Sequence, residues 1–348
     1  MRKRIALVCA ALSGAPLLHA AAPGTETHVT FTDYSPLSSN AEMARRLLSP
    51  LTAAQLPQLL QRSAAALSEQ PIDLAAEEFL LYVPADAPPQ GYGLLVFVPP
   101  WPQAELPRGW APVLDRHHLI FVTAARSGND ANVLARREPL ALLAEHNVAA
   151  RYRLDPERIY VGGFSGGARV AMRLALAYPD VFRGALLDAG SDPIGDSATP
   201  LPGRELFSRF QESSRLIYLT GAADQARLQL AADSMRSMRQ WCVFDVHDQI
   251  IRRATRDSTS HDEADAGALQ AALDELLKPA KPAAGKLAAC RGGIERELAA
   301  RLAAVQTLID EGKSHAARAA LDSIDKRFGG LAAPRSLELQ RTIDQPHE

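Results

Sequence analysis

Short apolar runs alternate with longer helical patterns through residues 77–278, and this alternation limits the fold more than any other feature of the chain. Seven runs have the length and composition of strands: 77–84, 92–100, 118–125, 158–165, 184–190, 215–221 and 242–251. Helical patterns lie between or after them at 131–152, 167–178, 225–240 and 262–277. Several runs are apolar on both sides of the alternation, as in strands that helices cover on both faces. The pattern predicts an α/β fold with a mostly parallel central sheet.

The stretch "YVGGFSGGAR" (160–169) places a serine between glycines where the fourth run meets a helical pattern. A G-x-S-x-G sequence at a strand-to-helix turn is typical of an exposed nucleophile. Gly163 and Gly167 suit a tight turn in which a Cβ atom would crowd the neighbouring strand and helix. The amide groups at the start of the helix favour developing negative charge. We therefore predict that Ser165 is a nucleophile and not a hydroxyl in an ordinary turn.

A serine needs a base, and the base needs an acid that orients it. His261 lies in "RDSTSHDEAD", a polar loop that follows the last apolar run. Asp224 follows the run 215–221, and the order Ser165, Asp224, His261 is that of α/β hydrolases. Asp192 is the reserve candidate for the acid. Asp224 also has an alternative interpretation as the cap of the helix that follows it.

The groups that would bind the oxyanion are less regular in this sequence. One donor should be the backbone N–H of Gly166, the residue after the nucleophile. The second normally lies after an early strand, where this chain has "VFVPPWPQ", and proline has no N–H to donate. Trp101 is the first residue there that can donate, although the turn also has a purely structural interpretation. Asn129, in "ARSGND", is expected to reach the same cleft.

Three segments together resemble one group of α/β hydrolases, the polyhydroxybutyrate depolymerases and feruloyl esterases. They are "LDPERIYVGGFSGGARVAMRLALAYPDVFRGALLDAGSDP", "IYLTGAADQAR" and "SHDEAD". The resemblance implies an α/β-hydrolase fold of up to eight strands over residues 77–278, with Ser165, Asp224 and His261 as the catalytic triad. The chain departs from the group in its proline pair and in lacking a polymer-adsorbing module. Small or oligomeric esters are therefore the expected substrates.

Composition excludes some functions and leaves three open. With 38 basic and 40 acidic residues, the chain has no charge excess for binding nucleic acid or an anionic membrane. No cysteine cluster indicates zinc, so we expect neither metal nor cofactor. The triad predicts a serine esterase that forms an acyl-enzyme. A serine peptidase and a catalytically weak scaffold that acts through its tail are the alternatives.

The N-terminus predicts export of the protein. Three basic residues precede the apolar stretch "IALVCAALSGAPLL", and small residues follow it, which is the layout of a secretory signal peptide. The stretch is too short to span a bilayer, and no later segment is apolar enough to do so. We expect a secreted or periplasmic protein in which Cys242 and Cys290 form a disulfide. Two buried thiols are the alternative.

After the last hydrolase helix, a proline- and alanine-rich linker leads into a helical tail. The tail predicts two amphipathic helices with a turn at Gly312 and a short third helix after Pro334, similar to one tetratricopeptide unit. One such unit cannot bury a core alone, so it should dock on the hydrolase domain, with a protein-binding surface as the alternative. The predicted division of the chain is 1–22 signal peptide, 23–76 N-terminal helical segment broken near Pro50 and Pro57, 77–278 α/β-hydrolase domain, 279–290 linker and 291–348 helical tail.

Overall fold

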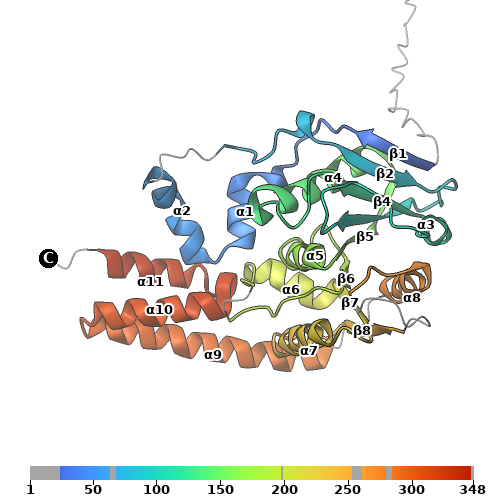
Figure 1. Cartoon of the computed structure of the whole chain (residues 1–348). Coiled ribbons are helices and arrows are strands. Elements are labelled where there is room, and N and C mark those ends of the chain that lie inside the picture. Colours follow the sequence, from blue (N-terminus) through green and yellow to red (C-terminus); the bar gives the residue numbers. More distant parts are fainter. Residues whose placement is uncertain (1–23, 63–67, 197–198, 253–260, 280–283, 346–348) are drawn as a thin grey trace, which may run out of the picture.

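The central feature of the computed structural model is one sheet of eight strands (Figure 1). The structure describes residues 24–62, 68–196, 199–252, 261–279 and 284–345, so the predicted signal peptide lies outside the described residues. The strand order is β1-β2-β4-β3-β5-β6-β7-β8. The strands are β1 (Gly24–Val29), β2 (Phe79–Val83), β3 (Tyr92–Val98), β4 (Leu119–Ala124), β5 (Leu154–Phe164), β6 (Gly184–Asp188), β7 (Arg215–Gly221) and β8 (Val246–Ile251).

Along this order the strands from β4 to β8 are parallel, whereas β1 pairs with β2, and β2 with β4, in the antiparallel sense. This is the α/β-hydrolase fold that the sequence predicts. The eighth strand, however, comes from the segment 23–76, which was predicted to be helical. Its sequence "GTETHV" is mostly polar and exposed, because an edge strand packs little of its surface, and it therefore lacks the apolar pattern of a buried strand.

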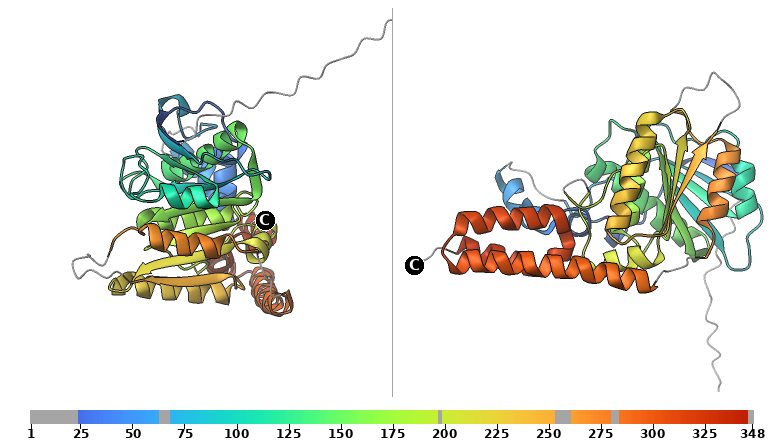
Figure 2. Two further views of the ribbon diagram at one scale, coloured as in Figure 1. Left: turned by 90° about the vertical axis from the view of Figure 1, so that its right-hand side faces the viewer. Right: turned by 90° about the horizontal axis from the view of Figure 1, so that it is seen from below.

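Helices cover both faces of the sheet (Figure 2). One apolar core lies under α4 to α7, and a second lies under α3 and α8. The helices are α3 (Ala111–His117), α4 (Glu138–Arg151), α5 (Gly166–Ala177), α6 (Arg204–Ser213), α7 (Gln225–Gln240) and α8 (Ala266–Leu276). Four follow the predicted helical patterns, whereas α3 and α6 had not been predicted. The pattern 131–152 divides into a π-helical turn, η3 (Val133–Arg137), and α4.

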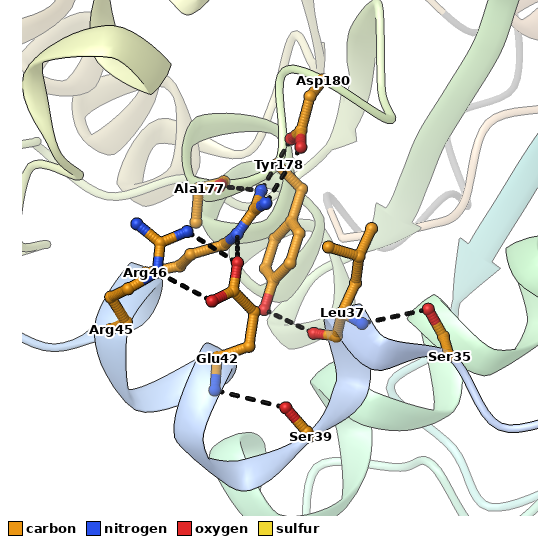
Figure 3. A network of polar contacts seen from close by, with 9 residues as sticks. All are labelled: Ser35, Leu37, Ser39, Glu42, Arg45, Arg46, Ala177, Tyr178 and Asp180. Atoms are coloured by element: carbon orange, nitrogen blue, oxygen red, sulfur yellow. Dashed lines mark hydrogen bonds and ion pairs between the residues drawn. The ribbon is translucent and has the colours of Figure 1, made fainter.

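The N-terminal segment docks on the end of α5 through a buried arginine (Figure 3). Arg46, at the end of α1 (Asn40–Leu47), is only 6% exposed and donates to the carboxylates of Glu42 and Asp180. Its guanidinium lies 4.6 Å from the centre of the Tyr178 ring, whose hydroxyl donates to the carbonyl of Leu37. The hydrogen bond from the Arg45 side chain lowers the pKa of Glu42 to about 2. The network therefore satisfies a charge that would otherwise be costly to bury.

The second N-terminal helix, α2 (Pro50–Arg62), contains Pro57 in its interior. The predicted break near Pro57 is therefore wrong, whereas Pro50 does mark a boundary because it begins the helix. Short 3₁₀ turns, η1 (Pro36–Ser38) and η2 (Leu74–Ala76), flank this region.

Three helices form an elongated tail that reaches beyond the sheet (Figure 2). They are α9 (Ala284–Asp310), α10 (Ser314–Phe328) and α11 (Arg335–Asp344), with a 3₁₀ turn, η4 (Gly329–Ala332), before α11. The predicted turn at Gly312 and the helix after Pro334 are present. Residues 284–290, predicted as linker, belong to α9, since alanine, leucine and lysine favour helix in "AGKLAAC". In the described part of the chain, no helix combines the length and apolarity needed to cross a membrane.

The tail shares one apolar core with the face of the sheet that α4 to α7 cover. The ring of Phe328 packs edge-on against Trp241 at 5.7 Å, and Arg327 forms an ion pair with Asp196 at 2.7 Å. A disulfide joins Cys242, just after α7, to Cys290 in α9, and their Cα atoms lie 5.9 Å apart. The tail is thus docked on the hydrolase fold at several points.

Candidate active site

Ser165 occupies the turn between β5 and α5 in a strained backbone conformation. Its φ angle is +54°, which residues other than glycine rarely adopt, and such strain is concentrated at functional sites. A Cβ atom on Gly163 would overlap the backbone of Gly167, and one on Gly167 would overlap the carbonyl oxygen of Val98. One on Gly190 would overlap the carbonyl oxygen of Ser165 itself. The glycines thus allow two strands and a helix to approach closely enough to form this turn.

His261 connects Ser165 to Asp224. The Nε2 atom of His261 lies 2.9 Å from Oγ of Ser165, and its Nδ1 atom lies 2.8 Å from Oδ2 of Asp224. The imidazole ring packs on the ring of Phe164, with 5.0 Å between centroids. The other oxygen of Asp224 accepts the backbone N–H of Arg227 at 3.1 Å and so caps α7. The helix cap and the contact with His261 are therefore compatible, because each uses a different oxygen of Asp224.

The loop that carries His261 is fixed by contacts that the sequence did not reveal. The N–H of Ala264 donates to Oδ2 of Asp188 at 2.7 Å, and the indole of Trp110 donates to the carbonyl of Ala264 at 2.9 Å. Asp188 ends β6 and is fully buried. Burial raises the pKa of Glu263 to about 8, and the charges of Asp188 and Glu105 add to this effect. The loop is therefore fixed through both backbone groups of Ala264, its N–H and its carbonyl.

Arg137 fixes the proline-containing turn that precedes Trp101, a candidate oxyanion donor. No pattern in the sequence indicated this role. The buried guanidinium donates to the carbonyls of Pro99 at 2.8 Å and Ser127 at 2.9 Å. The N–H of Asn129 donates to the carbonyl of Pro100 at 2.9 Å. These bonds hold the turn that carries Trp101 against the neighbouring loop. The indole nitrogen of Trp101 is buried without a partner among the described residues, and its ring lies 6.1 Å from that of Phe164.

The N–H of Gly166 begins α5 directly after Ser165, as predicted for one oxyanion donor. The side chain of Asn129 lies against it, since a Cβ atom on Gly166 would overlap the Asn129 side-chain oxygen. The reserve acid Asp192 forms an ion pair with Arg169 at 2.8 Å. Of the two candidate acids, Asp224 is therefore the one that the structure places on His261.

Comparisons with known proteins find similarity to esterases. Residues 123–247 match the family model described as Esterase PHB depolymerase. A curated relative, poly(3-hydroxyalkanoate) depolymerase C of Paucimonas lemoignei, is 34% identical over 95 residues, which cover 24% of this chain and 23% of that protein. The match to this depolymerase therefore spans less than a quarter of its length.

Two solved structures illustrate the similarity to esterases. A thermostable esterase is 17% identical with a TM-score of 0.44, over 59% of this chain and 60% of that one. A ferulic acid esterase is 17% identical with a TM-score of 0.40, over 58% of this chain and 90% of that one. The strand order and the turn at Ser165 themselves define the α/β-hydrolase fold.

A cleft of about 600 Å³ opens beside Ser165 and Gly166. Apolar side chains from η3 and α5 line part of it, and Asn129 lies at its wall. Its charged lining consists of one carboxylate, Asp192, and four arginines: Arg137, Arg169, Arg173 and Arg227. Within the described ranges, no group of three or more histidine, cysteine or acidic side chains is arranged to hold a metal ion. The cleft thus brings the Ser165 hydroxyl, the start of α5 and several cationic side chains together.

Proposed function

We propose that this protein is a serine hydrolase that cleaves carboxylic esters through an acyl-enzyme formed on Ser165. The continuous hydrogen-bonded chain from Ser165 through His261 to Asp224 carries this proposal. The match of residues 123–247 to the Esterase PHB depolymerase model favours an ester over an amide substrate.

In the acylation step, Oγ of Ser165 attacks the carbonyl carbon of the ester while Nε2 of His261 removes the hydroxyl proton. The new C–O bond gives a tetrahedral intermediate, and Asp224 stabilises the imidazolium that forms. The bond between the carbonyl carbon and the alkoxy oxygen then breaks. His261 returns its proton to that oxygen, and the alcohol leaves.

In the deacylation step, water repeats the attack on the acyl group of Ser165. His261 removes a proton from this water and then returns it to Oγ of the serine, which releases the carboxylic acid and restores the enzyme. The N–H groups of Gly166 and Trp101 are the proposed donors to the oxyanion in both steps. Such donors act best when they are fixed beforehand, and the bonds of Arg137 and Asn129 to the proline turn support that role.

We also propose that the protein is exported. The basic and apolar pattern of residues 1–22 supports a signal peptide, and the Cys242–Cys290 disulfide suits an oxidising compartment. Cell fractionation followed by N-terminal sequencing tests this, since cleavage near residues 20–22 is expected. A full-length protein in the cytoplasm would contradict it.

Labelling with a fluorophosphonate and turnover of p-nitrophenyl butyrate test the proposed reaction. Ser165→Ala should lose labelling, and Ser165→Ala and His261→Ala should each lower kcat by roughly 10⁴-fold or more, without adding in the double variant, because the residues act as one unit. Asp224→Asn should cost less, since nucleophile and base remain. Circular dichroism of each variant checks that it folds.

Two outcomes would contradict parts of this proposal. A folded wild-type protein that neither labels nor hydrolyses any ester would exclude the esterase. A severe loss in Asp192→Asn combined with a nearly silent Asp224→Asn would show that the acid has been assigned wrongly.

A further inference from the structure

Four arginines surround the cleft beside Ser165, and they come from three different elements. Arg169 and Arg173 lie on the side of α5 that lines the cleft, three and seven residues after Gly166, and therefore about 4.5 and 10.5 Å further along the helix axis. Arg137 ends η3, and Arg227 lies in the first turn of α7. The positive charge thus begins one helical turn from the nucleophile and continues along the cleft.

Within the described residues, acidic side chains neutralise only part of this charge. Arg169 pairs with Asp192 at 2.8 Å, and Arg173 pairs with the fully buried Glu138 at 2.7 Å. The polar contacts of Arg137 are with oxygens of neutral groups, the carbonyls of Pro99 and Ser127 and the side chain of Asn129. The guanidinium of Arg227 has no hydrogen bond or ion pair with a described residue. The four cations of the lining therefore have two carboxylate partners, of which only Asp192 lines the cleft.

Arg227 is the arginine of the cleft whose position has no evident structural role. The burial of Arg137 and the ion pair of Arg173 have structural explanations, because they fix a turn and a helix. Arg227 contributes its backbone N–H to Asp224, but its half-buried side chain faces the cleft without a partner in the described ranges. A guanidinium in such a position is suited to bind a carboxylate through two parallel hydrogen bonds.

We propose that the preferred substrates are esters that carry a carboxylate in addition to the ester group. This inference rests on the proposed esterase function and narrows its substrate class. Arg227 and Arg169 bind the carboxylate, while Arg137 and Arg173 contribute positive potential to the cleft. The apolar side chains of Val133, Leu134 and Val170 contact the carbon chain between the carboxylate and the scissile bond.

Two matched pairs of esters test the proposal, one for each half of the substrate. The first pair is p-nitrophenyl hexanoate and the p-nitrophenyl monoester of adipic acid, which differ by a carboxylate on the acyl half. The second is 4-carbamoylphenyl butyrate and 4-carboxyphenyl butyrate, which differ on the alcohol half. In at least one pair, kcat/KM should be about tenfold higher for the anionic ester, as expected for a hydrogen bond between charged groups. Added salt should reduce this ratio.

Substitutions on α7 test whether the preference for anionic esters arises in the cleft. Arg227→Gln should remove most of the ratio between anionic and neutral esters, whereas Arg227→Lys should retain part of it because the charge remains. Arg236→Gln is the matched control, since Arg236 lies on the same helix but is exposed outside the cleft and pairs with Asp233. It should leave the rates for both kinds of ester unchanged.

The outcomes separate this inference from the proposed function. If neutral esters are hydrolysed and neither pair shows a preference for the anion, the inference is overturned and the esterase stands. The same holds if the preference survives in the double variant Arg169→Gln, Arg227→Gln. If no ester is hydrolysed and no fluorophosphonate label is incorporated, the proposed function and this inference are both wrong.

Discussion

The two carboxylate oxygens of Asp224 connect His261 to helix α7. One oxygen accepts from the first turn of α7 and the other contacts His261, so the orientation of the imidazole is fixed by the position of a helix. Asparagine also caps helices well, so Asp224→Asn retains the cap while removing the charge that faces the imidazole. A loss of activity in that variant therefore reports on the histidine contact and not on the stability of α7.

Glu263 should make the stability of the protein depend on pH. Burial raises its pKa from an ordinary 4.5 to about 8, so between these values the folded state holds a proton that the unfolded state releases. The free energy of unfolding should therefore fall as pH rises from about 4.5 to about 8 and level off at higher pH, where both states have lost the proton. Glu263→Gln mimics the protonated acid and should reduce the fall. Urea denaturation at several pH values measures it, and equal pH dependence in both proteins would contradict the prediction.

Part of the candidate site could be predicted because its residues lie where strands end. Ser165, Asp224 and His261 each follow an apolar run, and the carboxyl ends of parallel strands meet at one edge of a sheet. Arg137 gave no such signal, because it ends the stretch "VLARR", whose two adjacent arginines are typical of a solvent-exposed helix. It is the π-helical turn that buries Arg137. Trp110 and Asp188 were missed as anchors of the histidine loop because their partner is a backbone group, which has no sequence signature.

At the scale of elements, long buried elements were predictable and short or edge elements were not. Helix α7 has the bounds that its periodicity predicts, because apolar residues repeat along one face over 16 residues. The helix α3 spans only 7 residues, too few for a clear period, and β1 is a polar edge strand. Pro57 was misleading because α2 continues through it, although a proline inside a helix has no N–H to donate and usually breaks or kinks the helix.

Two glycine-to-alanine changes, one at the turn beside Ser165 and one in α9, should have opposite effects on the stability of the protein. Gly167→Ala should destabilise the protein by about 3 kcal/mol or more, because the new Cβ atom would overlap the carbonyl oxygen of Val98 and must displace α5 or β3. Gly293→Ala, at an open position inside α9, should stabilise by about 0.5–1 kcal/mol through reduced backbone freedom. Thermal and urea unfolding compare the two. A Gly167→Ala protein as stable as the wild type would disprove the close contact described here.

At the scale of the whole molecule, the tail and the sheet behave as one body. Residues of α9, α10 and α11 belong to the same apolar core as residues of α4 to α7. This agrees with the prediction that a single helical unit must dock. The surface on which it docks could not be predicted, because it depends on Trp241 and on the loop that carries Asp196, which meet the tail only after the sheet has formed.

Removing the disulfide should lower the free energy of unfolding of the protein without changing its fold. Cys242 and Cys290 are separated by 48 residues, and closing a loop of that length contributes about 4 kcal/mol in the chain-entropy model. The double variant Cys242→Ser, Cys290→Ser should unfold at correspondingly lower urea concentration than the oxidised wild type. A reducing agent should lower the stability of the wild type and leave the variant unaffected. Equal stability of the oxidised wild type and the variant would contradict the prediction.

The carboxylate of Asp325 accepts the backbone N–H of Leu51 at 3.1 Å and the hydroxyl of Ser49, across 274 and 276 positions of the chain. A ribosome that adds about 5–20 residues per second produces α10 tens of seconds after α2 has emerged. During that interval the start of α2 lacks its acceptor and part of its apolar packing. Helix α2 is therefore among the first helices to be synthesised and among the last that can take its final place, and a chain interrupted before α10 leaves the start of α2 without this acceptor.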